Sequence, residues 1–118
     1  MDSIFSKIIN KEISSDIRYE DELCIAIDDI NPKSRVHILV IPKKPIINIS
    51  TSSDADKDLL GHLILVCKKL AKKMNIEKEG YQVLTNIGEG GGQTVMHLHF
   101  HLLSGNTVTL WFFLYNIY

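Results

Sequence analysis

The sequence has little of what marks secreted, membrane-bound or nucleic-acid-binding proteins. Its two cysteines, Cys24 and Cys67, are too few and too far apart for a disulfide framework, and each lies in an apolar stretch typical of a reduced, buried thiol. Thirteen Lys and Arg balance fourteen Asp and Glu, so no basic field favours nucleic acid or a membrane as a partner. The chain begins without the basic and apolar segments of a signal peptide. We therefore expect a cytoplasmic protein, with the nucleus as a second compartment.

The length and composition are those of one small domain. Hydrophobic residues make up 45% of the 118 residues and charged residues 23%, which is enough apolar material for one core. The sequence contains no internal repeat and no interdomain linker. We therefore expect a single folded unit.

Hydrophobic periodicity and turn residues predict two helices and five strands. One helix is expected at the N-terminus, with Ser3 as its cap, and a longer helix between residues 53 and 75. The strands are expected at residues 17–20, 23–28, 36–41, 81–87 and 94–103. The long helix carries an apolar stripe, with aspartates near its start and lysines near its end that complement the helix dipole. We expect an α+β fold with a mainly antiparallel sheet.

Three of the five histidines fall within five residues, as His97, His99 and His101, with apolar residues between them. On a strand, alternate side chains share a face, so the three imidazoles are expected on one face and the apolar residues on the other. A neutral imidazole can attack phosphorus at physiological pH because its unperturbed pKa lies near 6.5. Such a nucleophile needs an acceptor on its other ring nitrogen, either a backbone carbonyl or a neighbouring histidine.

A glycine-rich loop precedes the histidines, with four of the seven glycines between Gly88 and Gly92. Glycine lets backbone N–H groups approach an anion without interference from a Cβ atom. A loop of this kind is also a common flexible connection between strands. Its position next to three histidines favours a phosphate as its occupant.

Zinc binding is the competing interpretation of the histidines. A zinc site needs three or four ligands, and His37 or His101 is available as the third. Alternate residues on one strand lie about 6.6 Å apart, so three in a row do not easily converge on one ion. A purely structural role is less favoured, because three buried imidazoles need three sets of partners. His62, isolated on the long helix, is interpreted as a surface or boundary residue with no chemical role.

The segment from His97 to Leu103 matches the pattern His-φ-His-φ-His-φ-φ of the histidine triad (HIT) superfamily of nucleotide hydrolases and transferases. Residues 3–9, 28–32, 37–44, 59–63 and 91–95 also resemble the Hint branch, the purine nucleoside phosphoramidases. The resemblance covers about residues 2 to 105, so residues 1–105 are taken as the HIT domain. It implies a HIT-like five-stranded antiparallel sheet with one long and one short helix. It also implies a homodimer that pairs its sheets across a two-fold axis.

The resemblance assigns catalytic roles to individual positions. His99 matches the nucleophile that forms a nucleotidyl-histidine intermediate, and His101 matches the residue on the phosphate and leaving-group side. His97 and His37 match the histidines that orient and polarise the nucleophile. Thr94 stands where this branch commonly has serine and keeps the hydroxyl. The implied reaction is hydrolysis of the P–N bond in adenosine or guanosine 5'-phosphoramidates, AMP-lysine included, with no metal or other cofactor.

The resemblance also implies a site for the purine nucleotide, AMP or GMP. Asp29 matches the carboxylate that binds the ribose hydroxyls, although taken alone it is equally well a solvated turn residue. The apolar purine slot is expected from Phe5, Ile8, Ile27 and Leu39, with Ile30 beside Asp29, and the phosphate surroundings from Asn86, Gly92, Gln93, Thr94, His99 and His101. Two alternatives stay open: a dinucleoside polyphosphate hydrolase of the same superfamily, and a nucleotide-binding module with vestigial catalysis.

The last 13 residues depart from the family pattern. Residues 106–118 carry no charge and hold five of the nine aromatic residues, all within the last eight positions. This segment is too short to span a membrane as a helix, and its composition is that of an aggregation-prone strand. It is therefore treated as a divergent apolar tail.

Overall fold

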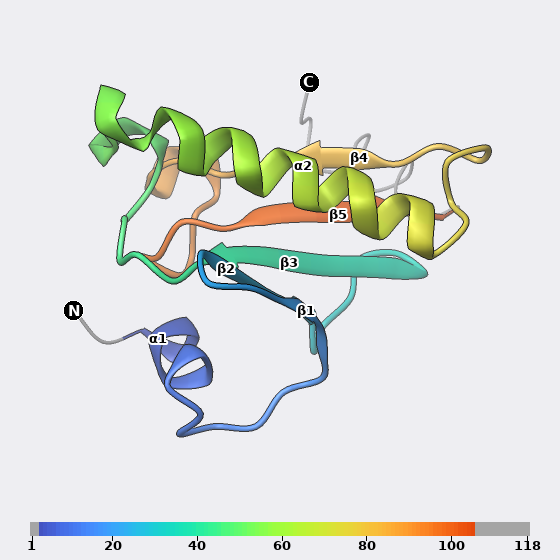
Figure 1. The fold of residues 1–118 in the computed structure, drawn as a ribbon, viewed down its shortest axis with the longest axis horizontal. Helices are drawn as coiled ribbons and strands as arrows, with labels where there is room; N and C mark the ends of the chain where they lie inside the picture. Colours follow the sequence, from blue (N-terminus) through green and yellow to red (C-terminus); the bar gives the residue numbers. More distant parts are fainter. Residues whose placement is uncertain (1–2, 106–118) are drawn as a thin grey trace.

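The computed structural model describes residues 3–105, and it forms one five-stranded sheet with helices on both faces (Figure 1). The elements are α1 (Ile4–Ile9), β1 (Ile17–Glu20), β2 (Cys24–Asp28), β3 (Val36–Pro42), α2 (Lys57–Lys73), β4 (Gln82–Leu84) and β5 (Phe100–Ser104). The strand order is β1-β2-β3-β5-β4, and each neighbouring pair is antiparallel. The predicted α+β class and mainly antiparallel five-stranded sheet are confirmed. The expected tail, residues 106–118, lies outside the described residues.

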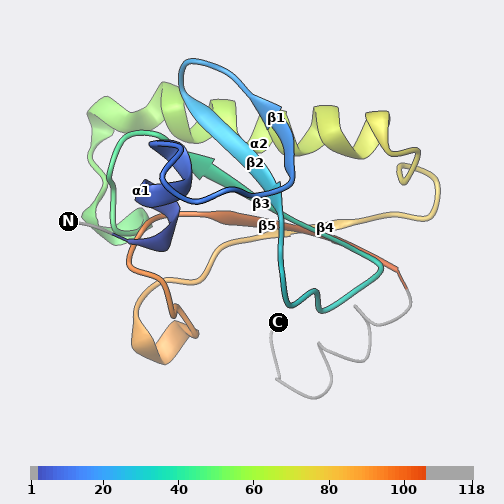
Figure 2. The same ribbon diagram turned by 90° about the horizontal axis from the view of Figure 1, so that it is seen from below.

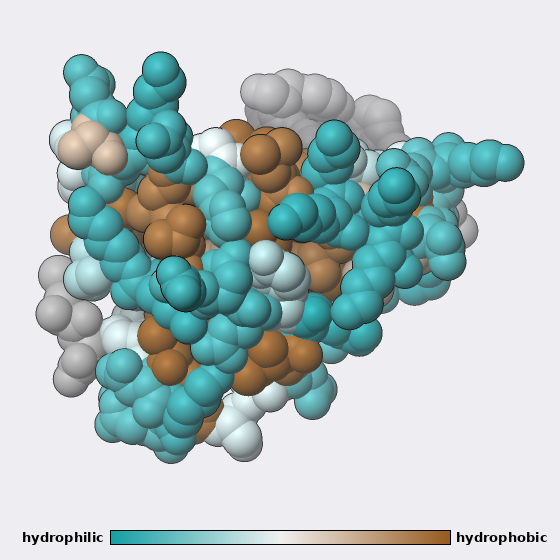
Figure 3. Space-filling view, viewed as in Figure 1, coloured by the Kyte–Doolittle hydropathy of each residue, from teal (hydrophilic) through white to brown (hydrophobic). Residues whose placement is uncertain are grey.

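The sheet separates two apolar layers. On one face the long helix α2 packs through Leu63, Val66 and Leu70 in a fully buried cluster with β2, β3 and β5. On the other face the short helix α1 packs through Phe5 and Ile8 on a smaller cluster from β2 and β3. Figure 1 shows α2 above the strands and α1 below them, and Figure 2 shows the same arrangement seen from below, from the side of α1. In the face drawn in Figure 3 hydrophilic side chains dominate the surface, with hydrophobic patches between them.

Helix α1 begins as the sequence predicts, whereas α2 begins at Lys57, later than the expected start near residue 53. The Ser3 hydroxyl accepts a hydrogen bond from the Ser6 backbone N–H (3.1 Å), and Ser3 N–H donates to the Ser6 hydroxyl (2.8 Å), which makes a capping box. The long helix α2 is preceded by a 3-10 turn over Asp54–Asp56 that Ser53 caps. No helix within residues 3–105 has the length and apolarity needed to cross a membrane.

The histidine segment corrects one prediction. A strand was expected over residues 94–103, but β5 begins at Phe100, so His97 and His99 lie before the strand. The cause is tertiary: Leu98 N–H donates to the Ile46 carbonyl oxygen (2.7 Å), which draws this segment away from the sheet ladder. Strand β4 is likewise shorter than the expected residues 81–87.

Candidate active site

A pocket of about 410 Å³ lies on the α1 side of the sheet, within the size range of small-molecule sites. Helix α1, the end of β2, strand β3 and the histidine segment enclose it. Nine of the residues expected at the site line it: Phe5, Ile8, Ile27, Asp29, Ile30, Leu39, Thr94, His99 and His101. The structure therefore brings the expected apolar slot, carboxylate and two of the histidines together around one cavity.

The hydrogen bond on His99 fixes its tautomer. Its Nδ1 lies 2.7 Å from the His97 carbonyl oxygen, which can only accept, so Nδ1 carries the proton. Nε2 then holds the free lone pair, and among residues 3–105 it has no hydrogen-bond partner. The Phe5 ring packs edge-on against the imidazole, with ring centroids 4.9 Å apart, and holds its plane.

His97 does not line the pocket, but its backbone carbonyl orients His99 and its side chain is held in place. It is 3% exposed, and its Nε2–H donates to the Pro42 carbonyl oxygen (2.8 Å). Its Nδ1 lies 3.4 Å from the Ser3 hydroxyl at the start of α1. The backbone carbonyl that orients His99 is therefore held by contacts to β3 and α1.

His37 and His101 form a direct pair. The Lys33 backbone N–H donates to His37 Nδ1 (3.0 Å), so the neutral ring carries its proton on Nε2 and donates it to His101 Nδ1 (2.9 Å). The neutral His101 must then carry its own proton on Nε2, on a ring that lines the pocket. These proton positions give the pocket one imidazole acceptor, Nε2 of His99, and one imidazole donor, Nε2–H of His101.

Burial keeps the four histidines neutral. It lowers the pKa of His37, against the opposing charge of Asp29, and it lowers the pKa values of His97 and His99. For His101, burial together with His99 and His37 lowers the pKa to about 3. At physiological pH the free protein therefore holds unprotonated lone pairs at the site.

Asp29 lies where the pocket meets the end of β2. Its N–H donates to the His37 carbonyl oxygen (2.9 Å), and its Oδ1 accepts from Asn31 N–H (2.9 Å). Its Oδ2 lies 3.4 Å from His37 Nε2. Asp29, His37 and His101 place potential ligand atoms within 4.8 Å of one another, so the metal alternative involves this group and not the three motif histidines.

The remaining expected phosphate residues do not line this pocket. The Gln93 amide is buried and donates to the Ile47 and Val95 carbonyl oxygens, while its Oε1 accepts from Asn48 and Gly88. Every hydrogen-bonding position of that side chain is used within the protein, so Gln93 anchors the loop.

Asn86 and Gly92 also belong to the loop itself. The Asn86 amide donates to the Gly91 carbonyl oxygen (2.8 Å). Gly92 has a φ of +86°, which favours glycine, and a Cβ there would lie 3.4 Å from Asn86 Nδ2. The phosphate contacts expected of Asn86, Gly92 and Gln93 stay predictions.

Sequence reasoning missed part of the pocket wall. The additional lining residues are Ile4, Ile13, Ser14, Ser15, Asp28, Asn31 and Val95. Ser14 and Ser15 lie in the connection between α1 and β1, which has no periodic pattern, and tertiary packing alone brings them to the end of β2. The family resemblance assigns Ile27 on β2 to the pocket but leaves Asp28 at the strand end unassigned.

His62 has a partner that the sequence did not indicate. On α2, its Nε2 lies 2.6 Å from Asp21 Oδ2, in the turn between β1 and β2. Asp21 also accepts a hydrogen bond from the Tyr19 hydroxyl (2.8 Å). His62 lies on the face of the sheet opposite the pocket and joins α2 to this turn.

The fold and the site together define a small α+β domain whose pocket holds neutral histidines beside an apolar slot. A family model described as the HIT domain matches residues 10–108, and the chain belongs to this family. The chain is 50% identical to an uncharacterized HIT-like protein of Synechococcus elongatus over 107 residues, which are 91% of this chain and 93% of the relative. It is 43% identical to the purine nucleoside phosphoramidase of Escherichia coli over 104 residues, 88% of this chain and 87% of the relative.

Solved structures agree with this assignment. A HIT family hydrolase from Legionella pneumophila superposes with a TM-score of 0.87 at 39% identity, covering 89% of this chain and 94% of that chain. A HIT family hydrolase from Clostridium thermocellum gives a TM-score of 0.86 at 44% identity, covering 89% of this chain and 91% of that chain. The HIT-like fold expected from the motif is therefore confirmed.

Proposed function

We propose that this protein hydrolyses the P–N bond of purine nucleoside 5'-phosphoramidates, with His99 as the nucleophile. The observation that carries the proposal is the hydrogen bond from His99 Nδ1–H to the His97 carbonyl oxygen, because it leaves the Nε2 lone pair free. The similarity to HIT family hydrolases, and to a purine nucleoside phosphoramidase at 43% identity, supports the same reaction class.

The pocket suits a mononucleotide with few polar anchors. We infer that the base lies in the apolar slot between Phe5, Ile8 and Ile27, and the ribose hydroxyls at the Asp29 carboxylate. Ile30 lines the pocket, yet 84% of its surface is exposed. An apolar side chain in that position gains burial when a nucleoside covers it.

The histidine pair supplies the proton that the leaving amine needs. An anionic phosphate beside His37 and His101 raises their pKa values, so the pair takes up a proton when the substrate binds. His99 Nε2 bonds to the α-phosphorus as the P–N bond breaks, and His101 Nε2–H gives its proton to the departing nitrogen. Water then attacks phosphorus, the bond between His99 Nε2 and phosphorus breaks, and one proton from water returns to His101 Nε2. The products are a nucleoside monophosphate and an amine.

We further propose that the protein is a homodimer. The sheet ends on β4, whose outer edge carries unpaired backbone groups among residues 3–105, and Val83 on it is 37% exposed. Light scattering after size-exclusion chromatography measures the mass, and a monomer across the micromolar range refutes this part. The cytoplasmic location stays a prediction.

The test is AMP release from adenosine 5'-phosphoramidate by chelator-treated protein, compared with His99→Ala and with His62→Gln as a histidine control outside the pocket. We expect the parent and the control to turn over. We expect His99→Ala to lose at least about 1,000-fold in kcat/KM while its AMP affinity stays within about threefold.

Each other outcome has a distinct meaning. Turnover by His99→Ala refutes the assigned nucleophile, and loss of parent activity on chelation, restored by metal, supports a metal at Asp29, His37 and His101. Faster cleavage of diadenosine triphosphate identifies the dinucleoside polyphosphate hydrolase. AMP binding without any turnover identifies the nucleotide-binding module.

A further inference from the structure

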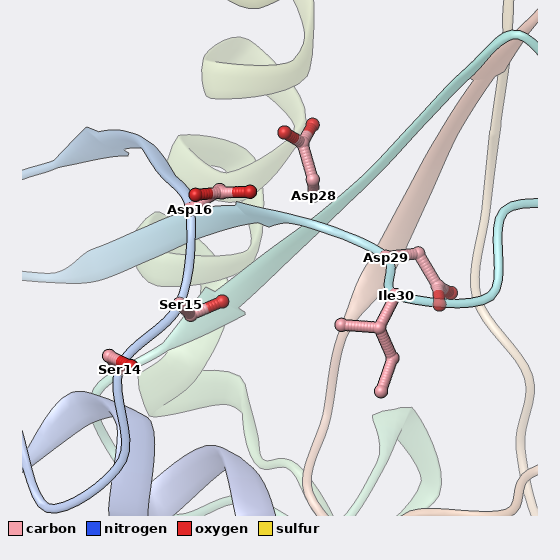
Figure 4. Close-up of a pocket in the computed structure, with 6 residues that line it drawn as sticks. All are labelled: Ser14, Ser15, Asp16, Asp28, Asp29 and Ile30. Atoms are coloured by element: carbon pink, nitrogen blue, oxygen red, sulfur yellow. The ribbon is translucent and has the colours of Figure 1, made fainter.

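A second hollow of about 360 Å³ adjoins the pocket (Figure 4). Its lining residues are Ser14, Ser15, Asp16, Asp28, Asp29 and Ile30, and all except Asp16 also line the first pocket. The two hollows are therefore one continuous depression. Figure 4 shows the connection carrying residues 14–16 facing the end of β2 and the loop of Asp29 and Ile30.

The wall of this second hollow differs from the apolar slot in its chemistry. The side chains of Ser14, Ser15 and Asp16 have no hydrogen-bond partner within residues 3–105. The Asp16 carbonyl oxygen accepts from Asp28 N–H (3.1 Å), which fixes the connection against β2. Arg18 Nε donates to both carboxylate oxygens of Asp28 (3.0 Å each) and offsets that charge. Asp16 lies near enough to Arg18 for its charge to help raise the pKa of that guanidinium, but within residues 3–105 the Asp16 carboxylate accepts no hydrogen bond, so both of its oxygens are open to a ligand.

The serine hydroxyls and the Asp16 carboxylate determine which hydrogen-bonding groups a bound base must carry on its edge. An ionised carboxylate only accepts hydrogen bonds, whereas a serine hydroxyl donates or accepts. The guanine N1–H and 2-amino group are two adjacent donors that match the two oxygens of one carboxylate. Adenine places an unprotonated N1 beside its amino group, and that lone pair is repelled by a carboxylate. Hypoxanthine offers N1–H without the 2-amino group and lies between the two.

We infer that the rim formed by Ser14, Ser15 and Asp16 reads the polar edge of the base and selects guanine over adenine, with Asp16 as the main determinant. This inference rests on the proposed function, because the polar edge of a base in the apolar slot reaches the rim only if the phosphate lies at His99 and the ribose at Asp29. The apolar slot accepts either purine by its faces, so discrimination between them falls to the rim.

Titration calorimetry with GMP, IMP and AMP tests the inference on the parent, on Asp16→Asn, and on Glu77→Gln, an exposed carboxylate far along the chain from the rim. We expect the parent and Glu77→Gln to bind GMP about tenfold more tightly than AMP, with IMP between them. In Asp16→Asn the ratio should fall to within about threefold, mainly through weaker GMP binding, because an amide offers only one acceptor oxygen.

The outcomes separate this inference from the function beneath it. Equal affinities for GMP and AMP in the parent overturn guanine selection and leave the proposed function standing. A GMP preference that Asp16→Asn keeps overturns the role of the rim. Failure of all three nucleotides to bind overturns both.

Discussion

The two faces of the sheet are made from the same strands but serve different purposes. On β3, Val36, Ile38 and Val40 face α2, while His37, Leu39 and Ile41 face α1. The α2 face is a closed apolar layer with side chains exposed by no more than a few per cent. The α1 face is covered by a helix of only six residues and leaves room for the pocket. Alternation along one strand thus supplies the core and the site at once.

Burial acts on both faces, with opposite chemical results. On the α2 face it raises the pKa values of Cys24 and Cys67 to about 12, which keeps both thiols protonated and unreactive. On the α1 face it lowers the pKa of His101 to about 3 and leaves the imidazole neutral. The neutral form of a thiol is inert, whereas the neutral form of imidazole is a nucleophile or a hydrogen-bond donor. The residue type decides which face is reactive.

The largest expected contrast in stability comes from truncating one side chain on each face. Leu102 is fully buried in the α2 layer, so Leu102→Ala should lower the free energy of unfolding by about 3 kcal/mol through the cavity it leaves. Below the unfolding transition its AMP affinity should stay within about twofold. Ile8→Ala, at the pocket, should cost about 2 kcal/mol and weaken AMP about tenfold. Urea unfolding and calorimetry measure both. Equal losses of affinity in the two variants would remove the distinction between the faces.

The second comparison of the two faces is the pH dependence of the free energy of unfolding. The folded pKa of His101 is about 3, and the unfolded value is about 6.5, so below pH 6.5 the unfolded chain binds a proton that the folded chain excludes. The free energy of unfolding should therefore fall as the pH drops, by about 2 kcal/mol from this residue at pH 5. His101→Gln should remove this residue's share of the dependence between pH 7 and pH 5 and leave the shares of the other buried histidines, whereas His62→Gln should keep the full slope. An unchanged slope in His101→Gln contradicts the buried neutral imidazole.

Local patterns predict the scaffold better than the site. The Ser3 cap, the apolar stripe of α2 and the continuous apolar run of β3 each depend on neighbouring residues, and each is found in the structure. The histidine segment was predicted as a strand from its alternation alone. Contacts to Ile46 and Pro42, more than 50 residues away in sequence, draw it off the sheet instead.

Some site features depend wholly on tertiary packing. The proton order along His37 and His101 depends on the Lys33 backbone N–H, which no sequence pattern identifies. The motif therefore indicates which residues meet, while the tautomers that make one of them an acceptor and another a donor come from packing.

The smallest expected effect tests whether His62 belongs to the scaffold face. It joins α2 to the turn at Asp21 through a contact of 2.6 Å, on the face away from the pocket. His62→Gln should cost about 1 kcal/mol of unfolding free energy and leave phosphoramidate turnover within about twofold. A double-mutant cycle with Asp21→Asn should give a coupling of about 1 kcal/mol, since the two side chains touch.

Zero coupling would make this contact irrelevant to stability. A large loss of turnover in His62→Gln would show that the two faces are energetically linked through β2, and the contrast between them would then hold for structure but not for function.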